Sequence, residues 1–294
     1  MEFHFTPSER LKKILKVIVK VIISSIALYI VLKNIDLKRT KIILSQSNML
    51  WLLFALIFFN FSQMISSFRL NYFFKAIGLS LSSNYNMKLY YVGMFYNLFL
   101  PGGIGGDGYK VYLLNKHHKT PVKDLIWASL LDRGTGLVSL IILALIALIF
   151  SRAYLAMAGF RYLVYVALVF ILPVYYLFVK IAFPKFVGVF KNTNFLALVV
   201  NTVETVGMIA ILLALHVHAQ YSDYLVLFFI ADIAAVIPFT IGGVGARELI
   251  FLLGCKYLSI DVNTGVAFSL IFFLITALSS FTGAFLNVQE SENN

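Results

Sequence analysis

Several ionisable residues lie inside or beside long apolar stretches of this sequence, where a charge is costly. At the centre of a bilayer each costs about 2.5–3.5 kcal/mol to insert, so such residues usually face the interior of a helix bundle and mark a functional site. We therefore treat them as candidates for binding a polar ligand. They are Arg69, Asp107, Asp132, Arg133, Glu204, Asp232, Arg247 and Glu248.

Two Pro/Gly motifs repeat along the chain. Residues 101–110 read PGGIGGDGYK and residues 238–247 read PFTIGGVGAR, so the second follows the first by 137 positions. Pro removes a backbone donor and Gly tolerates unusual backbone angles, so each motif should break a helix. The freed polar groups must line a cavity or pack inside protein, which favours a transporter-like binding site. A simple kinked spanning helix is the alternative. The shared glycines are Gly105, Gly106 and Gly108 in the first motif and Gly242, Gly243 and Gly245 in the second.

Lys110 and Arg247 occupy equivalent positions in the two motifs, each at an expected helix start. A helix N-terminus beside a cation suits an anion such as a lipid phosphate. The alternatives are snorkelling to the interface, or structural pairing with Asp107 and Glu248. Asp107 itself is expected either to gate the site or to cap the following helix.

The remaining candidates keep two interpretations each. Asp132 and Arg133 point about 100° apart on a helix, so they need not pair with each other; either could instead pair with Arg69 or Glu248. Glu204, flanked by Asn201, Thr202 and Thr205, could couple transport to protons or make an ordinary helix contact. Asp232 has no counterpart in the other motif.

The elements that position these residues follow from composition. The chain is 61% hydrophobic and 13% charged, whereas soluble domains are about 45–50% apolar and about 25% charged. We expect an all-α polytopic membrane protein, a single membrane domain over 1–294, with about eight membrane segments. Six are long enough to span, namely 14–32, 49–74, 125–150, 162–183, 195–215 and 262–286, and two short ones, 88–100 and 223–237, precede the Pro/Gly motifs.

The 137-residue offset also predicts two inverted repeat halves, about 14–150 and 151–287, each with a re-entrant broken segment and three crossings. Positive charge then favours a cytoplasmic N-terminus in the inner membrane of a bacterium or archaeon. Eight straight spans with the N-terminus outside fit the charges equally well. The basic first segment favours the re-entrant version.

Other function classes are disfavoured. The net charge of +11 comes from short loops between apolar stretches, so we expect no nucleic-acid partner. The pairs His117-His118 and His216/His218 lack Cys or carboxylate ligands at metal spacing, so no metal or other cofactor is expected. Cys255 is the one cysteine.

Three segments in order carry a family resemblance: Pro101 to Asp107, Ala128 to Leu137, and Pro238 to Glu248, with Arg69 ahead of them. They resemble the transmembrane, flippase-like domain of lysylphosphatidylglycerol synthases and its stand-alone relatives. Lys110 stands where that family usually has Arg, which keeps the charge but loses the bidentate fork. Full-length synthases carry a soluble transferase domain after the membrane part. This chain ends at Asn294, so we expect no transferase activity.

The resemblance implies a lipid translocase that moves an anionic phospholipid or polyprenyl-linked headgroup. Membrane lipids are then the expected partners. A non-transporting partner of a lipid-modifying or glycan-assembly enzyme is the alternative. An ion channel is a further rival, and two charged Gly turns per chain argue against a filter.

Overall fold

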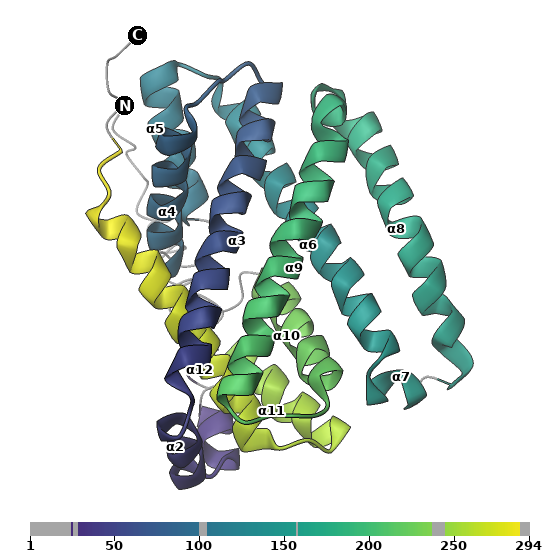
Figure 1. The fold of residues 1–294 in the computed structure, drawn as a ribbon. Helices are drawn as coiled ribbons and strands as arrows, with labels where there is room; N and C mark the ends of the chain where they lie inside the picture. The colour runs from purple at the N-terminus through teal and green to yellow at the C-terminus, as the bar shows by residue number, and fades with distance from the viewer. Residues whose placement is uncertain (1–24, 26–28, 100–104, 157, 237–244, 289–294) are drawn as a thin grey trace, which may run out of the picture.

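In a computed structural model of the chain, residues 25, 29–99, 105–156, 158–236 and 245–288 are described. Every regular element among them is helical (Figure 1). The α-helices are α2 (Leu37–Ser45), α3 (Met49–Ala76), α4 (Ser83–Phe99), α5 (Gly105–His118), α6 (Val122–Ile149), α7 (Arg152–Ala156), α8 (Arg161–Ala182), α9 (Phe190–Ala214), α10 (Tyr221–Val236), α11 (Ala246–Leu258) and α12 (Val262–Phe281), with 3-10 turns η1 (Ala158–Phe160), η2 (Pro184–Val189) and η3 (Thr282–Phe285).

Five stretches of the described chain are long and apolar enough to cross a membrane, and they agree with five of the six predicted long spans. The sixth, 14–32, lies largely outside the described residues, so the total of eight segments stays a prediction. The all-helical membrane architecture is confirmed. The five are Met49–Ala76, Val122–Ile149, Arg161–Ala182, Pro184–Ala214 and Val262–Phe285.

The order of helix lengths occurs twice. A long helix, two short helices and a long helix run from α3 to α6, and the same order runs from α9 to α12. The two leading helices, α3 and α9, pack along each other in opposite directions. Asn48 caps the start of α3 with its side chain, and its backbone N–H donates to the Ala214 carbonyl at the end of α9 over 2.9 Å. At the other end of the pair, Phe73 of α3 contacts Phe186 of η2.

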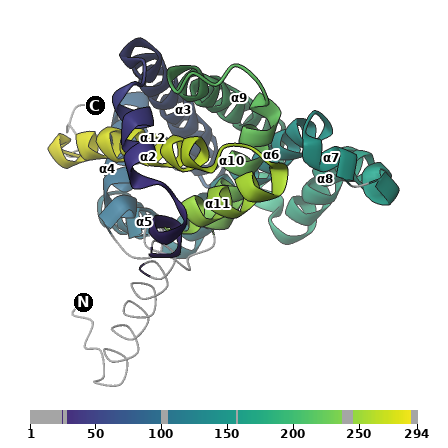
Figure 2. The same cartoon turned by 90° about the horizontal axis from the view of Figure 1, so that it is seen from below.

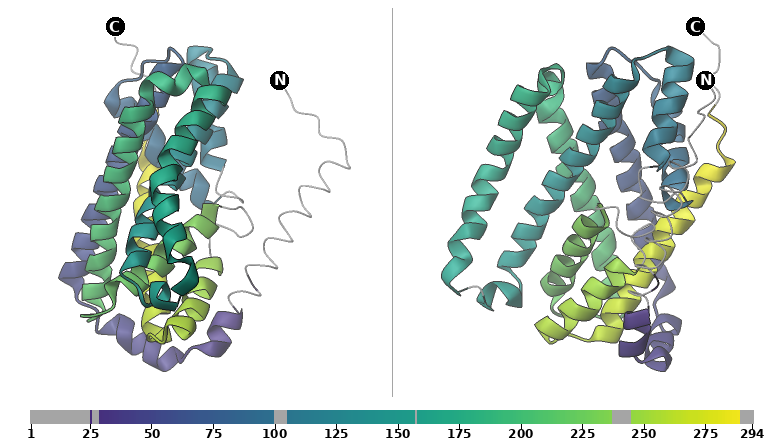
Figure 3. Two further views of the ribbon diagram at one scale, coloured as in Figure 1. Left: turned by 90° about the vertical axis from the view of Figure 1, so that its right-hand side faces the viewer. Right: turned by 180° about the vertical axis from the view of Figure 1, so that it is seen from behind.

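The short helices form two pairs in opposite halves of the bundle's length. Figures 1 and 3 show α4 and α5 side by side in one half and α10 and α11 in the other. The segments that join each pair, 100–104 and 237–244, fall outside the described residues, as do Pro101, Pro238, Gly242 and Gly243.

The first glycine motif is helical for longer than predicted. Gly105 and Gly106 form the first turn of α5 and do not lie in a turn before it. The Asn97 side chain accepts the Gly106 N–H over 2.8 Å, so α4 satisfies a donor that helix starts leave open. The absence of a side chain at Gly106 also lets α5 approach α4 at Gly93.

Helix α8 lies at the edge of the bundle, away from α10, α11 and α12 (Figures 2 and 3). Only Val164 and Val179 of α8 are buried, and most of its apolar side chains are exposed. A helix that is apolar around its circumference and uncovered by protein suits contact with lipid tails. Tyr175 ties α8 to the bundle, because its hydroxyl lies 2.9 Å from that of Thr135 on α6.

Candidate functional site

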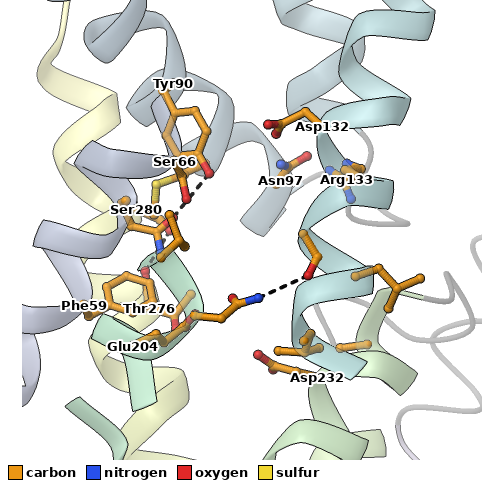
Figure 4. A pocket seen from close by; sticks show the side chains of 18 of the residues that line it. Phe59, Ser66, Tyr90, Asn97, Asp132, Arg133, Glu204, Asp232, Thr276 and Ser280 are labelled. Carbon is orange, nitrogen blue, oxygen red and sulfur yellow. Dashed lines mark hydrogen bonds between the residues drawn. The ribbon is translucent and has the colours of Figure 1, made fainter. Parts of the chain in front are cut away.

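A cavity of about 380 Å³ opens where α3, α4, α5, α6, α9, α10, α11 and α12 converge. Both sets of short helices contribute to its wall, as does each long helix of the repeated order (Figure 4). The wall therefore joins the two sequence motifs. Its polar and ionisable residues are Gln63, Ser66, Arg69, Tyr90, Asn97, Asp107, Lys110, Asp132, Arg133, Asn201, Glu204, Asp232, Arg247, Thr276 and Ser280.

Arg69 of α3 and Asp132 of α6 form a bidentate ion pair on this wall. The guanidinium Nε lies 2.7 Å from Asp132 Oδ1, and Nη2 donates to Oδ2 over 3.3 Å. Both residues are 6% exposed. This parallel arrangement is the geometry in which Arg binds a carboxylate best. Arg69 was one of the two partners expected for Asp132, and the pair fixes α3 against α6.

Asp107 shares its carboxylate between two cations. Lys110, one turn along α5, places Nζ 2.7 Å from Asp107 Oδ1, and Arg133 of α6 donates from Nε to Oδ2. Lys110 also lies over the Tyr90 ring, 5.3 Å from its centroid. Asp107 therefore neutralises side chains and does not cap α5, because it sits within the first turn of that helix. Adjacent residues of α6, Asp132 and Arg133, thus bind different helices.

Arg247 and Asp232 make the corresponding ion pair in the other half. Arg247 Nη2 lies 2.8 Å from Asp232 Oδ1, and the guanidinium lies 5.0 Å from the Phe272 ring centroid. Glu248, the partner expected for Arg247, makes other contacts. Glu248 accepts the Gly245 N–H over 2.7 Å and the Ser269 hydroxyl over 3.0 Å, so it holds the start of α11 and does not line the cavity.

Glu204 of α9 stands apart from these pairs. It lines the cavity, yet no ion pair or hydrogen bond to its carboxylate occurs among the described residues. Figure 4 shows Glu204 and Asp232 on facing sides of the cavity. The side-chain amide of the neighbouring Asn201 is engaged with α6, because it donates to the Gly136 carbonyl over 3.1 Å and to the Ser139 hydroxyl over 2.5 Å. Within the part of the chain that the structure describes, the hydrogen-bonded helix contact expected as one interpretation of Glu204 is not formed.

The predicted site residues fall into three groups. The cavity brings together Arg69, Asp107, Lys110, Asp132, Arg133, Glu204 and Arg247. Gly105, Gly106 and Glu248 support the adjoining helices without lining the cavity, and Gly242 and Gly243 lie outside the described residues. The role of all these residues in binding a lipid stays a prediction.

Sequence reasoning missed part of the wall. Asp232 received little weight because it has no repeat counterpart, and the uncharged residues Gln63, Ser66, Tyr90, Asn97, Thr276 and Ser280 were not singled out. Their spacing carried the signal. Gln63, Ser66 and Arg69 recur every third position of α3, so they share one face of the helix. Thr276 and Ser280 are four apart on α12.

The ionisable groups on the wall balance one another. Among the described residues, four cations and four carboxylates face this cavity, and three of the carboxylates pair with all four cations. The charged groups of a ligand can therefore take the place of wall residues in these ion pairs. The ligand does not meet a surface of one sign.

Comparison with known proteins agrees with this membrane architecture. The family model described as lysylphosphatidylglycerol synthase TM region matches residues 17–283. Similar curated proteins include the phosphatidylglycerol lysyltransferases of Staphylococcus aureus strains COL and N315, each 26% identical over 248 residues, and that of strain MSSA476, 26% identical over 247 residues. Each match covers 80% of this chain and 29% of the relative. The chain thus spans less than a third of these relatives' length.

Proposed function

The chain belongs to the lysylphosphatidylglycerol synthase TM region family, and from this premise we propose that it translocates a phospholipid with an anionic headgroup across the cytoplasmic membrane. It is a multi-pass membrane protein related to lipid-modifying enzymes. The proposal gives this membrane region a transport role without a catalytic one.

The observation that carries the proposal is the cavity shared by both halves of the chain. Its wall offers cations from α5 and α11 at one place, together with uncharged donors suited to a headgroup. Within the described residues the buried Arg247 Nε–H has no acceptor, so it is available to a ligand oxygen. We propose that the lipid phosphate contacts Arg247 and Lys110 while the acyl chains stay between helices.

We further propose that the two halves, about 14–150 and 151–287, are inverted repeats and that α4–α5 and α10–α11 are re-entrant pairs. Three observations support this. The helix order repeats, α3 and α9 run antiparallel, and the short pairs lie in opposite halves of the bundle (Figure 1). Transporters built this way place the substrate where the broken segments meet, and they alternate access by moving one half against the other.

Lipid movement is tested with the full chain in phosphatidylcholine vesicles that contain a trace of acyl-labelled phosphatidylglycerol. A membrane-impermeant quencher reports how fast inner-leaflet label reaches the outside. We expect the protein to raise this rate above that of protein-free vesicles. Lys110→Gln and Arg247→Gln should each lower phosphatidylglycerol binding by about tenfold or more, because each removes a charge-assisted contact, and the double variant should bind more weakly than either.

Lys185→Gln is the matched control, since Lys185 is exposed and pairs with Asp124 outside the cavity. It should bind and move label as the unaltered protein does. Unchanged lipid binding in a well-folded double variant would remove Lys110 and Arg247 from the site. Equal rates in protein-free and protein-containing vesicles would instead favour the non-transporting partner role.

The proposed topology puts the N-terminus and the α5–α6 connection in the cytoplasm. In a Cys255→Ser background, His117→Cys should resist an impermeant thiol reagent added to intact cells, and Lys41→Cys should react with it. Both positions are exposed, so access by the reagent is not limited by burial. Labelling at position 117 with protection at position 41 would reverse the orientation. Labelling at both would contradict the re-entrant arrangement of the first half.

A further inference from the structure

Among the described carboxylates of the cavity wall, Glu204 is the one that takes part in no ion pair. Arg69 is held by Asp132, Lys110 and Arg133 by Asp107, and Arg247 by Asp232. Counting these groups in their usual ionised forms gives the wall one excess positive charge, and an ionised Glu204 cancels it. The charge of the empty cavity therefore depends on whether Glu204 carries a proton.

Within the described part of the chain, the charged groups that face the cavity with Glu204 are those of the ion pairs named above. The undescribed segments 100–104 and 237–244 contain no ionisable side chain. Glu204 shares the cavity wall with Asp232, Arg247 and Arg69. The groups that face the cavity with it are Arg69 from α3, Tyr90 from α4, Asp107 and Lys110 from α5, Asp132 and Arg133 from α6, Asp232 from α10 and Arg247 from α11, and α12 offers the uncharged Thr276 and Ser280. Lys185 of η2, which packs on α9, pairs with Asp124 outside the cavity.

We infer that Glu204 is a proton site coupled to the headgroup, so that one proton enters the cavity with each headgroup that carries a single net negative charge. The inference rests on the proposed function, because it assumes that an anionic headgroup occupies the cavity. The step is a protonation only: a proton from water binds a Glu204 carboxylate oxygen, and no other bond forms or breaks. Cavity and ligand together stay neutral before and after binding.

The reason is electrostatic. A phosphodiester adds one negative charge to a neutral cavity inside the membrane, where low polarity strengthens repulsion between like charges. Asp107, Asp132 and Asp232 each hold a cation, so protonating any of them would break an ion pair. Glu204 has no such partner in the described chain, so proton uptake there relieves the repulsion without breaking an ion pair.

The coupling makes a directional prediction. The affinity for phosphatidylglycerol should rise as the pH falls, by up to about tenfold per pH unit for one linked proton, and then level off once Glu204 is protonated in the empty protein. Fluorescence anisotropy of acyl-labelled phosphatidylglycerol, with the full chain in phosphatidylcholine nanodiscs, measures this affinity across the pH range. Labelled phosphatidylcholine, which carries no net charge, should show no such slope.

Glu204→Gln imitates the protonated carboxyl and should bind phosphatidylglycerol tightly at every pH, without a slope. Glu204→Asp keeps a titrating group and should keep a slope. Asp124→Asn is the control, because Asp124 lies outside the cavity and its loss should leave the slope unchanged. Reactivity of the buried Cys255 thiol checks that each variant is folded.

The outcomes separate the two proposals. No preference for phosphatidylglycerol over phosphatidylcholine at any pH would overturn the proposed function. Phosphatidylglycerol binding without a slope, or a slope that persists in Glu204→Gln, would overturn the proton site and leave the function standing. Affinity for phosphatidylglycerol that falls as the pH falls would also overturn the proton site, since proton uptake would then oppose binding of the anionic headgroup.

Discussion

Arg69→Gln is expected to lower the free energy of unfolding by about 3–5 kcal/mol, the usual cost of breaking a buried ion pair from one side. The substitution leaves the Asp132 carboxylate, 6% exposed, without the guanidinium that binds both of its oxygens. Asp132→Asn should destabilise the protein for the converse reason. Both variants should accumulate poorly in the membrane.

The single cysteine offers a direct measurement. Cys255 is fully buried in α11, so a thiol-reactive fluorophore labels it when the bundle unfolds. Raising the temperature of the purified protein in detergent and following this labelling gives the unfolding midpoint of each variant. Arg69→Gln should unfold at a clearly lower temperature than the unaltered protein.

The double variant, Arg69→Gln with Asp132→Asn, should recover a large part of the loss, because two neutral amides can hydrogen-bond to each other and leave no charge unpaired. Lys185→Gln is the control for charge removal in general. The Lys185 side chain is 63% exposed, so the loss of its pair with Asp124 should cost no more than about 1 kcal/mol. A double variant no more stable than either single one would show that Arg69 and Asp132 act separately.

The sequence predicted where charge lies in the fold, but it named the pairs Arg69–Asp132 and Lys110–Asp107 only as alternatives and missed Arg247–Asp232. Ionisable residues inside apolar stretches were readable because the membrane makes them costly, and Arg69, Asp107, Asp132, Arg133 and Glu204 do line one cavity. Partner choice depends on how helices rotate and pack, which spacing along one helix does not determine. Neighbours on α6 therefore bind different elements.

The sequence repeat predicted the positions of the helices better than it predicted the contacts of the side chains. The 137-residue offset anticipated the short helices, since α10 starts at Tyr221, within one position of the place that Ser83 of α4 implies. Glu248, next to Arg247 in the second motif, was the structural partner expected for Arg247. Arg247 instead pairs with Asp232, which has no counterpart in the first half, so matching positions do not imply matching contacts.

Gly106 contributes to the fold for a different reason from the one predicted. The sequence suggests a turn glycine, needed for its backbone freedom. In the fold Gly106 is helical, and what matters is its missing side chain. A Cβ atom there would lie 1.8 Å from the Gly93 carbonyl oxygen and 2.6 Å from its carbon. Two backbones meet at this point, so no side-chain rotation can make room.

Gly106→Ala should therefore push α5 away from α4 and destabilise the protein by about 3 kcal/mol, at the upper end of the usual cost of overpacking. The shift should also carry Asp107 away from Arg133, so phosphatidylglycerol binding should weaken together with stability.

Gly108→Ala is a control within the same helix, because a Cβ at Gly108 meets nothing within 4 Å. Ala is the better helix former by about 0.8–1 kcal/mol, so this variant should be as stable as the unaltered protein or more so. Labelling of Cys255 against temperature compares the two directly. Equal midpoints for Gly106→Ala and Gly108→Ala would mean that α4 and α5 do not touch at Gly93, and the position of Asp107 in the cavity would then need another support.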